Sequence, residues 1–294
     1  MVSVVITTYG RNANIVMRAV DSVKKQTYAN WELFVVDDNK DNNPYSQAIK
    51  AALENEENTK IHYIKMEKNS GACVARNRGI QESKGEYIAF LDDDDEWLPE
   101  RLEKQLPLIK DEKVGFTYCG VWILNEKKGK KTSSWIKFDQ GHVYDKLLKT
   151  NFMGGVSNFI VKRRAVEVCG GFRDDMPSSQ DYELWLRLSK KYEVNSIAEN
   201  LVVFHIHEGD SIMKSYDRRI AGYRKILESY HEDIIKNKKT HSYQLYNLGK
   251  FLILNHENKE GFSWLGKAIK MYPPSAIYYI GVIIYWKMLR TIFH

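Results

Sequence analysis

The sequence has few cysteines, no closely paired cysteines and no hydrophobic run of membrane-spanning length. Cys73, Cys119 and Cys169 are an odd number without CxxC spacing, which predicts reduced thiols in a cytosolic protein and no zinc site. The apolar stretch from Ala276 to Trp286 is too short for a bilayer, which needs about 20 residues. No basic and apolar leader opens the sequence, so we expect a protein that is not actively secreted.

The charge balance is mildly basic, with 44 basic and 38 acidic side chains and a formal net charge of +6. This excess fits an anionic substrate or an anionic membrane surface as well as nucleic acid. A hydrophobic content of 43% is ordinary for a globular protein and supplies a sizeable core. The 294 residues are enough for one large α/β domain or for a catalytic domain with an appendage.

The first part of the chain alternates short apolar runs with stretches of helical spacing. Repeated β–α units of this kind imply a parallel sheet covered by helices. The predicted strands are residues 2–7, 31–36, 61–66 and 86–91, and the predicted helices are residues 15–23, 45–54 and 71–83.

The rest of the chain is first mixed and then helical. After Pro99 we expect a helix to about Lys110, strands at 114–124, 158–161 and 201–206, and a solvated hairpin tip at 126–131. From about Met213 the pattern is helical to the end, so we place a domain boundary near Ser211.

Four consecutive carboxylates, Asp92 to Asp95, follow the predicted strand at 86–91. Adjacent like charges repel, so such a run is costly unless it is solvated or offset by a cation. Strand alternation would put Asp92 and Asp94 on one side and Asp93 on the other. Two carboxylates converging at a strand end suit a hard divalent cation that keeps positions open for phosphate oxygens. The sequence argues against an EF-hand loop, because Trp97 stands where its glycine is needed.

Polar side chains also follow two other predicted strands. Thr7, Thr8 and Tyr9 come after the first strand, and Asp37 and Asp38 come after the second. Parallel α/β sheets bind ligands beyond the carboxyl ends of their strands, so one crevice is expected there. The first strand-to-helix turn has no GxGxxG sequence, which argues against a dinucleotide-binding dehydrogenase.

The ordered set of motifs resembles family 2 glycosyltransferases of the GT-A fold over roughly the first 210 residues. Each motif is weak alone, but the set in this order is specific. The matching segments are Val2 to Tyr9, Gln26 to Tyr28, Trp31 to Asn39, Asn69 to Gly71, Ala75 to Ile80 and Gly85 to Pro99.

The resemblance implies an α/β GT-A fold, which is Rossmann-like with a mainly parallel sheet flanked by helices, and it leaves the C-terminal all-helical extension outside the match. Residues 1–210 would form the transferase domain, with a nucleotide-binding half at about 1–98 and an acceptor half at about 99–210. Residues 211–294 would form the helical extension. The activity implied is inverting transfer from a nucleotide sugar, usually a UDP-sugar, with Mn²⁺ or Mg²⁺ as cofactor.

The resemblance also assigns roles to individual residues. Asp38 would read the base, Asp94 would bind the metal, and Asp181 would be the catalytic base although Gln180 replaces the family's preceding Glu. The expected metal ligands are Asp94 and His207, where His205 replaces the Arg of an Arg-x-His motif, and the expected donor-binding residues are Thr7, Tyr9, Asp38, Gly71, Arg76, Asp92 and Asp93.

Structural roles remain open for several of these side chains. Asp38 could start a polar turn, Asp181 could be a helix N-cap, and Arg76 could be a surface residue. His207 could be a loop histidine without a metal contact.

The partners expected are a nucleotide-sugar donor and a glycan or lipid-linked acceptor, and no nucleic acid. A cytoplasmic protein with peripheral contact at the inner face of the membrane would fit this acceptor. The last stretch, Ala276 to Phe293, would be either a packed C-terminal helix or an interfacial helix. Two rival functions are a sugar-phosphate nucleotidyltransferase, which the lone Gly10–Arg11 pair argues against, and a catalytically inactive scaffold, which the intact acidic residues argue against.

Overall fold

The computed structural model describes residues 1–54, 59–206, 215–282 and 284. The chain forms two compact units, each with its own core. The first unit comprises Met1–Tyr144, Phe152–Asp174 and Leu184–Glu208, and the second comprises Asp145–Asn151, Asp175–Glu183 and Gly209–His294. The predicted boundary near Ser211 lies outside the described residues.

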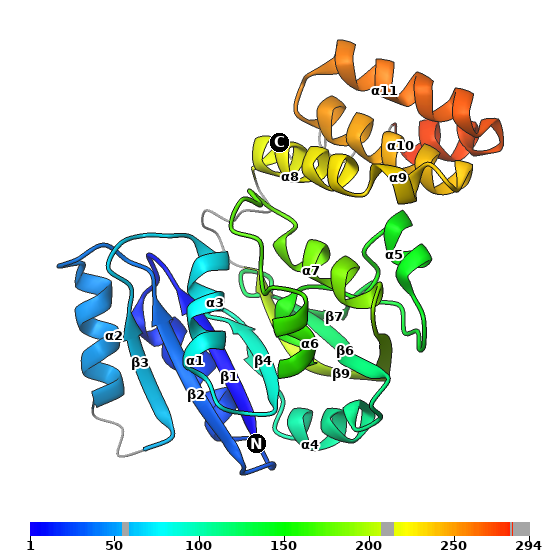
Figure 1. Cartoon of the computed structure of the whole chain (residues 1–294). Helices are drawn as coiled ribbons and strands as arrows, with labels where there is room; N and C mark the ends of the chain where they lie inside the picture. Colours follow the sequence, from blue (N-terminus) through cyan, green and yellow to red (C-terminus); the bar gives the residue numbers. More distant parts are fainter. Residues whose placement is uncertain (55–58, 207–214, 283, 285–294) are drawn as a thin grey trace. The chain divides into compact units, whose positions relative to one another are not determined.

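The first unit is built on a mixed β-sheet (Figure 1). Its first four strands run parallel in the order β3-β2-β1-β4, as the alternating pattern predicts, and the remaining strands continue the sheet as β8-β6-β9-β5, with β7 paired to β6. The strands are β1 (Val2–Thr8), β2 (Trp31–Asp37), β3 (Ile61–Lys65), β4 (Tyr87–Asp92), β5 (Glu96–Trp97), β6 (Val114–Asn125), β7 (Lys130–Ser133), β8 (Phe159–Lys162) and β9 (Glu193–Ile206). The sheet stops being parallel at β8, which is antiparallel to both β4 and β6.

Helices cover both faces of the parallel half of the sheet. Successive residues of β1 point to opposite faces. Val4 and Ile6 join a buried cluster with residues of α1 and α2, whereas Val5 meets α3 at Gly79. A Cβ at Gly79 would lie 2.4 Å from Val5 Cγ1, so α3 approaches the sheet too closely for any larger residue. The helices concerned are α1 (Ala13–Lys24), α2 (Pro44–Glu54) and α3 (Ala72–Glu82).

Shorter helices connect the later strands. The helix predicted after Pro99 is present as α4, which tightens into a 3-10 turn, η1. These elements are α4 (Arg101–Gln105), η1 (Leu106–Ile109), α5 (Tyr144–Lys149), η2 (Val156–Asn158), α6 (Arg163–Val168) and α7 (Gln180–Ser189). The predicted basic hairpin tip lies between β6 and β7, with its lysines exposed.

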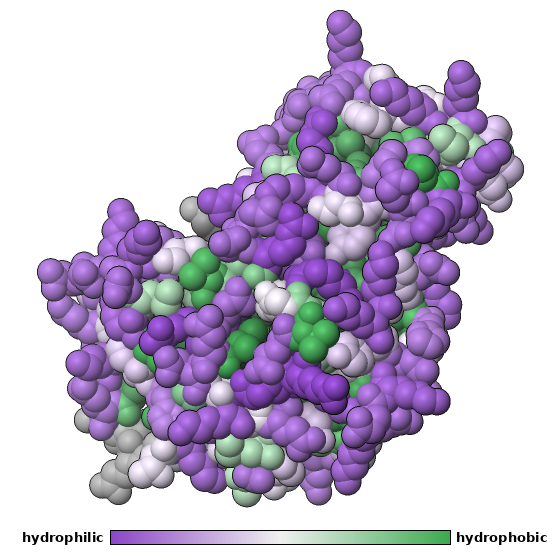
Figure 2. All heavy atoms as spheres, in the orientation of Figure 1, coloured by the Kyte–Doolittle hydropathy of each residue, from purple (hydrophilic) through white to green (hydrophobic). Residues whose placement is uncertain are grey.

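The second unit contains the predicted C-terminal helices. The backbones of α10 and α11 are nearly in contact, because a Cβ at Gly249 would lie 2.8 Å from the carbonyl oxygen of Gly261. Its elements are α8 (Tyr216–Ser229), α9 (His231–Ile234), α10 (Lys238–Leu254), α11 (Asn258–Met271) and η4 (Pro273–Ser275), and residues 276–282 are helical. Within the described ranges, none of the helices is long and apolar enough to cross a membrane. Figure 2 shows a molecular face covered mainly by hydrophilic side chains, with smaller apolar areas between them.

Candidate active site

The carboxyl ends of β1, β2 and β4 lie side by side, as the sequence predicts. Thr7 of β1 is aligned with Asp92 of β4, and Thr8 is aligned with Asp37 of β2. Tyr9 follows directly and is 57% exposed. The structure therefore brings the three polar clusters to one edge of the sheet, where α/β folds bind ligands.

The acidic run forms a turn rather than an extension of the strand. β4 ends at Asp92, and the Asp95 backbone N–H donates to the Asp92 carbonyl oxygen at 3.1 Å. The prediction that Asp93 points away from Asp94 is wrong, because both carboxylates bind Arg11, at 3.1 Å and 2.8 Å. Strand alternation fails here because the extended conformation ends at Asp92, two residues before the last carboxylate to which it was applied.

Burial separates the four carboxyl groups into two kinds. The Asp92 and Asp94 side chains are 40% and 24% exposed, whereas that of Asp93 is only 8% exposed. Burial raises the pKa of Asp93 to about 7, and the Arg11 charge opposes this shift. Burial also raises the pKa of Asp95, whose carboxylate accepts a hydrogen bond from Ser157 Oγ at 2.6 Å. Asp92 and Asp94 are thus the pair that faces solvent.

Two arginines that the motif analysis missed support this turn. Arg11 pairs with Asp93 and Asp94. Burial acts to lower the pKa of Arg11, but the negative charges of these carboxylates outweigh it and raise the pKa. Arg18 donates to the Asp94 carbonyl oxygen at 2.8 Å and pairs with Glu126 at 2.7 Å. The sequence contained a pattern that could have indicated such partners, because four adjacent acidic residues at the end of a strand repel one another unless cations lie nearby.

Arg76 lies at the same edge, near the start of α3. Its guanidinium donates to the Asp92 carboxylate at 2.8 Å and lies 5.4 Å from the centre of the Phe172 ring. α3 begins at the carboxyl end of the parallel strands, because Gly71, the residue before the helix, donates to Asp38, which follows β2. In this arrangement Arg76 offsets the charge of Asp92.

Asp38 is buried and anchors the loop before α3. Its two carboxylate oxygens accept hydrogen bonds from the backbone N–H groups of Ser70, at 2.8 Å, and Gly71, at 2.7 Å. Gly71 has φ +89°, a left-handed conformation that favours glycine. Each carboxylate oxygen has a second lone pair, so Asp38 can still accept a hydrogen bond from a further donor. Asp37 is occupied by the Tyr63 hydroxyl at 2.6 Å.

The last two predicted catalytic and metal-binding residues are placed differently. Asp181 lies in the first turn of α7 and belongs to the second unit. It is not the N-cap of the helix, because α7 already begins at Gln180. His207 lies outside the described residues. His205, before it, contacts Glu126 through Nδ1 at 2.8 Å.

The exposed carboxylates fit a divalent cation in donor type. Among residues 1–54, 59–206, 215–282 and 284, no group of three or more His, Cys, Asp and Glu side chains converges on a metal position. Asp92 and Asp94 nevertheless offer oxygen donors at the edge of the crevice. Mg²⁺ commonly uses only one or two carboxylates and completes its coordination with water and substrate phosphates. The residues present therefore suit a cation that arrives with a nucleotide.

The family model for glycosyl transferase family 2 matches residues 3–170, which include every strand end described above. The chain belongs to this family. It is therefore a glycosyltransferase, and the expected GT-A-like α/β fold with a C-terminal helical region is confirmed.

Individual relatives agree with this assignment. The chain is 31% identical over 199 residues to the Escherichia coli UDP-Glc:alpha-D-GlcNAc-diphosphoundecaprenol beta-1,3-glucosyltransferase WfgD, covering 67% of this chain and 73% of that protein. Its fold is similar to that of S. aureus TarS 1-349 in complex with UDP-GlcNAc, with a TM-score of 0.62, 14% identity and coverage of 93% and 92%. It is also similar to the Pyrobaculum calidifontis mannosyltransferase PcManGT in complex with GDP-Man and Mn²⁺, with a TM-score of 0.63, 15% identity and coverage of 98% and 79%.

Proposed function

We propose that this glycosyltransferase moves a sugar from a UDP-sugar to an acceptor hydroxyl of a lipid-linked glycan, with inversion, in the synthesis of a surface polysaccharide. The observation that carries the donor assignment is the acidic turn. Its two exposed carboxylates, Asp92 and Asp94, lie beside Arg11 and Arg76 at the strand ends. WfgD is named for a UDP-sugar donor and a diphosphate-linked lipid acceptor, which supports the same classes here.

Each residue at the strand ends has a role in holding the donor. Tyr9 is exposed and can stack on the base, while Asp38 can accept a hydrogen bond from the base imide. Asp94 and Asp92 would hold Mn²⁺ or Mg²⁺, which supplies positive charge against the departing diphosphate. Arg76 can pair with the pyrophosphate through its two-pronged guanidinium. Thr7, Gly71 and Asp93 complete the proposed donor site.

The chemical step needs a base for the acceptor. A hydroxyl is a poor nucleophile at neutral pH, and a carboxylate within hydrogen-bond reach can take its proton as it attacks. Asp181 is proposed for this role. The acceptor oxygen forms a bond to the anomeric carbon as the bond to the β-phosphate oxygen breaks. The nucleoside diphosphate leaves from the opposite face, so the configuration inverts. His207 is proposed as a further metal ligand.

Calorimetric titration of UDP into the full chain tests the donor site directly. With Mn²⁺ we expect binding in the micromolar range, and with EDTA we expect the heat of binding to disappear, because the acidic edge needs a cation before it accepts a diphosphate. GDP and dTDP titrations serve as controls for base selection. Equal binding of UDP with Mn²⁺ and with EDTA would contradict the proposed metal-dependent donor site.

The helix at residues 276–282 supports a proposal of peripheral membrane contact. Its packed side is Tyr279, which is 2% exposed and stacks on Tyr246 at 4.1 Å. Ile277, Ile280 and Ile284 recur at helical spacing and are 89%, 46% and 53% exposed. Residues 238–284 contain six lysines and two glutamates. An apolar stripe in a lysine-rich segment suits an anionic lipid surface on the cytoplasmic side.

Changing Ile277 and Ile280 together to glutamate is expected to weaken binding to vesicles containing phosphatidylglycerol by at least about tenfold. The physical reason is that two apolar side chains are lost from the proposed stripe, and the anionic lipids repel the two negative charges that replace them. Vesicle sedimentation of the full chain measures the effect. Ile235→Glu is the matched control, because Ile235 is 40% exposed in the same unit but outside the stripe. Unchanged sedimentation of the double variant would rule out the stripe as the contact.

A further inference from the structure

Two cations of the second unit share one aromatic surface. Arg219 of α8 has its guanidinium carbon 4.4 Å from the centre of the Phe251 ring, and Lys250 of α10 has its ammonium 5.1 Å from the same ring. Tyr216 lies 5.4 Å from the guanidinium, and Tyr246 lies 5.5 Å from the ammonium. Two positive charges are therefore held near each other against rings rather than extended into water.

The surroundings of Lys250 do not neutralise its charge. Burial, followed by the charge of Arg219, lowers the pKa of Lys250 to about 8. Its ammonium donates to Asn247 Oδ1 at 3.2 Å, and no carboxylate of the described residues forms an ion pair with it. Burial likewise lowers the pKa of Arg219. Like charges that are withdrawn from water repel each other, and an anion bound between them would relieve this repulsion.

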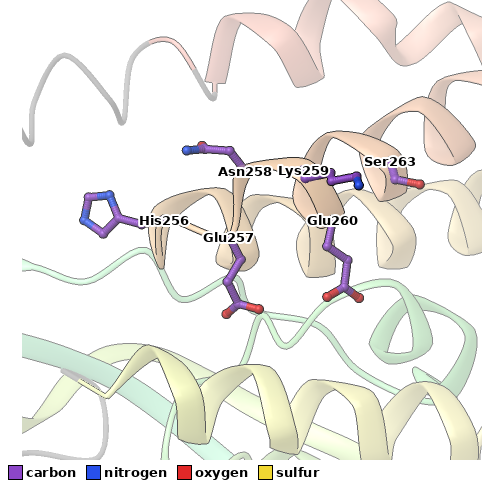
Figure 3. A pocket seen from close by; sticks show the side chains of 6 residues that line it. All are labelled: His256, Glu257, Asn258, Lys259, Glu260 and Ser263. Atoms are coloured by element: carbon purple, nitrogen blue, oxygen red, sulfur yellow. The ribbon is translucent and has the colours of Figure 1, made fainter.

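A surface hollow of the same unit is lined by side chains of both charges. It occupies 640 Å³ at the start of α11 and is lined by His256, Glu257, Asn258, Lys259, Glu260 and Ser263 (Figure 3). Two of its side chains are carboxylates, and that of Glu260 is already bound by Arg224 at 2.6 Å. With two carboxylates beside one lysine, this hollow is less suited to an anion than the paired cations on Phe251.

We infer that Arg219 and Lys250 bind the diphosphate that joins the acceptor glycan to its lipid, an inference that rests on the proposed function. A guanidinium presents a planar pair of donors that matches phosphate oxygens, and an ammonium adds a point charge. Two cations match the two or more negative charges of a diphosphate better than the single charge of a carboxylate. The aromatic rings hold both side chains in place before the ligand binds.

The position of this pair relative to Asp181 fits such an acceptor. Tyr182 follows Asp181, and its hydroxyl lies 3.4 Å from Gln244 Nε2 of α10. Lys250 is six residues further along the same helix, which corresponds to about 9 Å along the helix axis. The segment that carries the proposed base thus contacts the helix that carries Lys250, less than two helical turns from it.

Titration of inorganic pyrophosphate into the full chain in EDTA tests this inference, because the proposed donor site needs metal. We expect Lys250→Met and Arg219→Gln each to weaken pyrophosphate binding by at least about tenfold. Lys267→Met is the matched control, since Lys267 also lies over an aromatic ring, Trp264 at 4.1 Å, but is exposed. The control should bind as the unaltered chain does.

The outcomes separate this inference from the proposed function. UDP binding with Mn²⁺ should be unchanged in all three variants. If the unaltered chain does not bind UDP with Mn²⁺, the donor assignment is wrong and the inference about pyrophosphate is not affected. Normal UDP binding without pyrophosphate binding, or equal weakening by Lys267→Met, would overturn the inference. Equal affinity for orthophosphate would overturn the diphosphate assignment. Melting temperatures show whether each variant is folded. If Arg219→Gln unfolds, Lys250→Met still tests the inference, because methionine keeps the apolar packing of the lysine side chain.

Discussion

Asp94→Ala is expected to reduce Mn²⁺-dependent binding of UDP by at least about 100-fold, because even indirect partners of a metal typically cost 10–100-fold when removed. Asp94 is one of the two carboxylates of the acidic run that face solvent, and its exposed fraction of 24% leaves it accessible to a cation. The remaining exposed carboxylate, Asp92, is held by Arg76 at 2.8 Å. Asp92 alone therefore cannot supply the oxygen ligands that Asp92 and Asp94 supply together. Calorimetry with UDP and Mn²⁺ measures the loss.

The fold should survive this substitution. Arg11 keeps its contact with Asp93 at 3.1 Å, and removing one member of an acidic run also removes repulsion. The melting temperature should therefore change little. Asp21→Ala is the matched control, because Asp21 lies on α1 and its carboxylate pairs with Lys24 of the same helix at 3.3 Å. Undiminished UDP binding by Asp94→Ala would remove Asp94 from the metal site.

Asp181→Asn is expected to lower the turnover number by about 10²- to 10⁴-fold, the usual contribution of a general base. The amide keeps the size of the carboxylate, and its oxygen can still accept the 2.8 Å hydrogen bond from the Tyr182 backbone N–H. An amide cannot take the acceptor's proton, however. UDP release during incubation of a UDP-sugar with a membrane lipid extract measures turnover, and calorimetry should find UDP binding unchanged.

A neighbouring carboxylate provides the control for Asp181. Asp175 belongs to the same segment of the second unit, and its carboxylate pairs with Lys225. Asp175→Asn should keep full turnover. If Asp181→Asn also keeps full turnover, another group takes the proton and the proposed role of Asp181 is wrong.

The parallel half of the fold was predictable because its signals are local. Each strand is a short apolar run, and each run is followed by helical spacing, which together favour one architecture. The carboxyl-end rule then places Thr7, Asp38 and Asp92 at one edge without further information. The motif Gln26-Thr27-Tyr28 also acquires a physical reason. Gln26 donates to the Leu98 carbonyl oxygen at 2.8 Å and accepts from the Leu102 N–H at 3.0 Å, so it supports the segment after the acidic turn.

The acidic turn itself was not predictable in detail because distant residues determine it. Ser157 accepts from the Asp92 N–H at 3.0 Å and donates to Asp95 at 2.6 Å, and it comes 62 residues after Asp95. Arg11 comes from a part of the chain far before the acidic run. Periodicity contains no information about such contacts, so alternation was extended past the true end of the strand.

The second unit also depends on contacts that sequence patterns do not reveal. Asp175–Glu183 and Asp145–Asn151 belong to it although they precede the helical tail. Tyr182 and Leu147 from these segments are joined by a hydrogen bond of 2.5 Å. A boundary drawn from hydrophobic spacing places both segments with the sheet. The assignment of Asp181 to a domain is therefore a property of packing rather than of local sequence.

The pairing of Arg11 and Arg76 with the acidic turn has a consequence for the life of this protein in the cell. Structural zinc domains unfold without their metal because metal binding supplies their folding free energy. Here two guanidinium groups already offset the carboxylates that face solvent. The fold is therefore not expected to depend on a bound metal ion, and the protein should remain folded in a cell in which divalent cations are scarce.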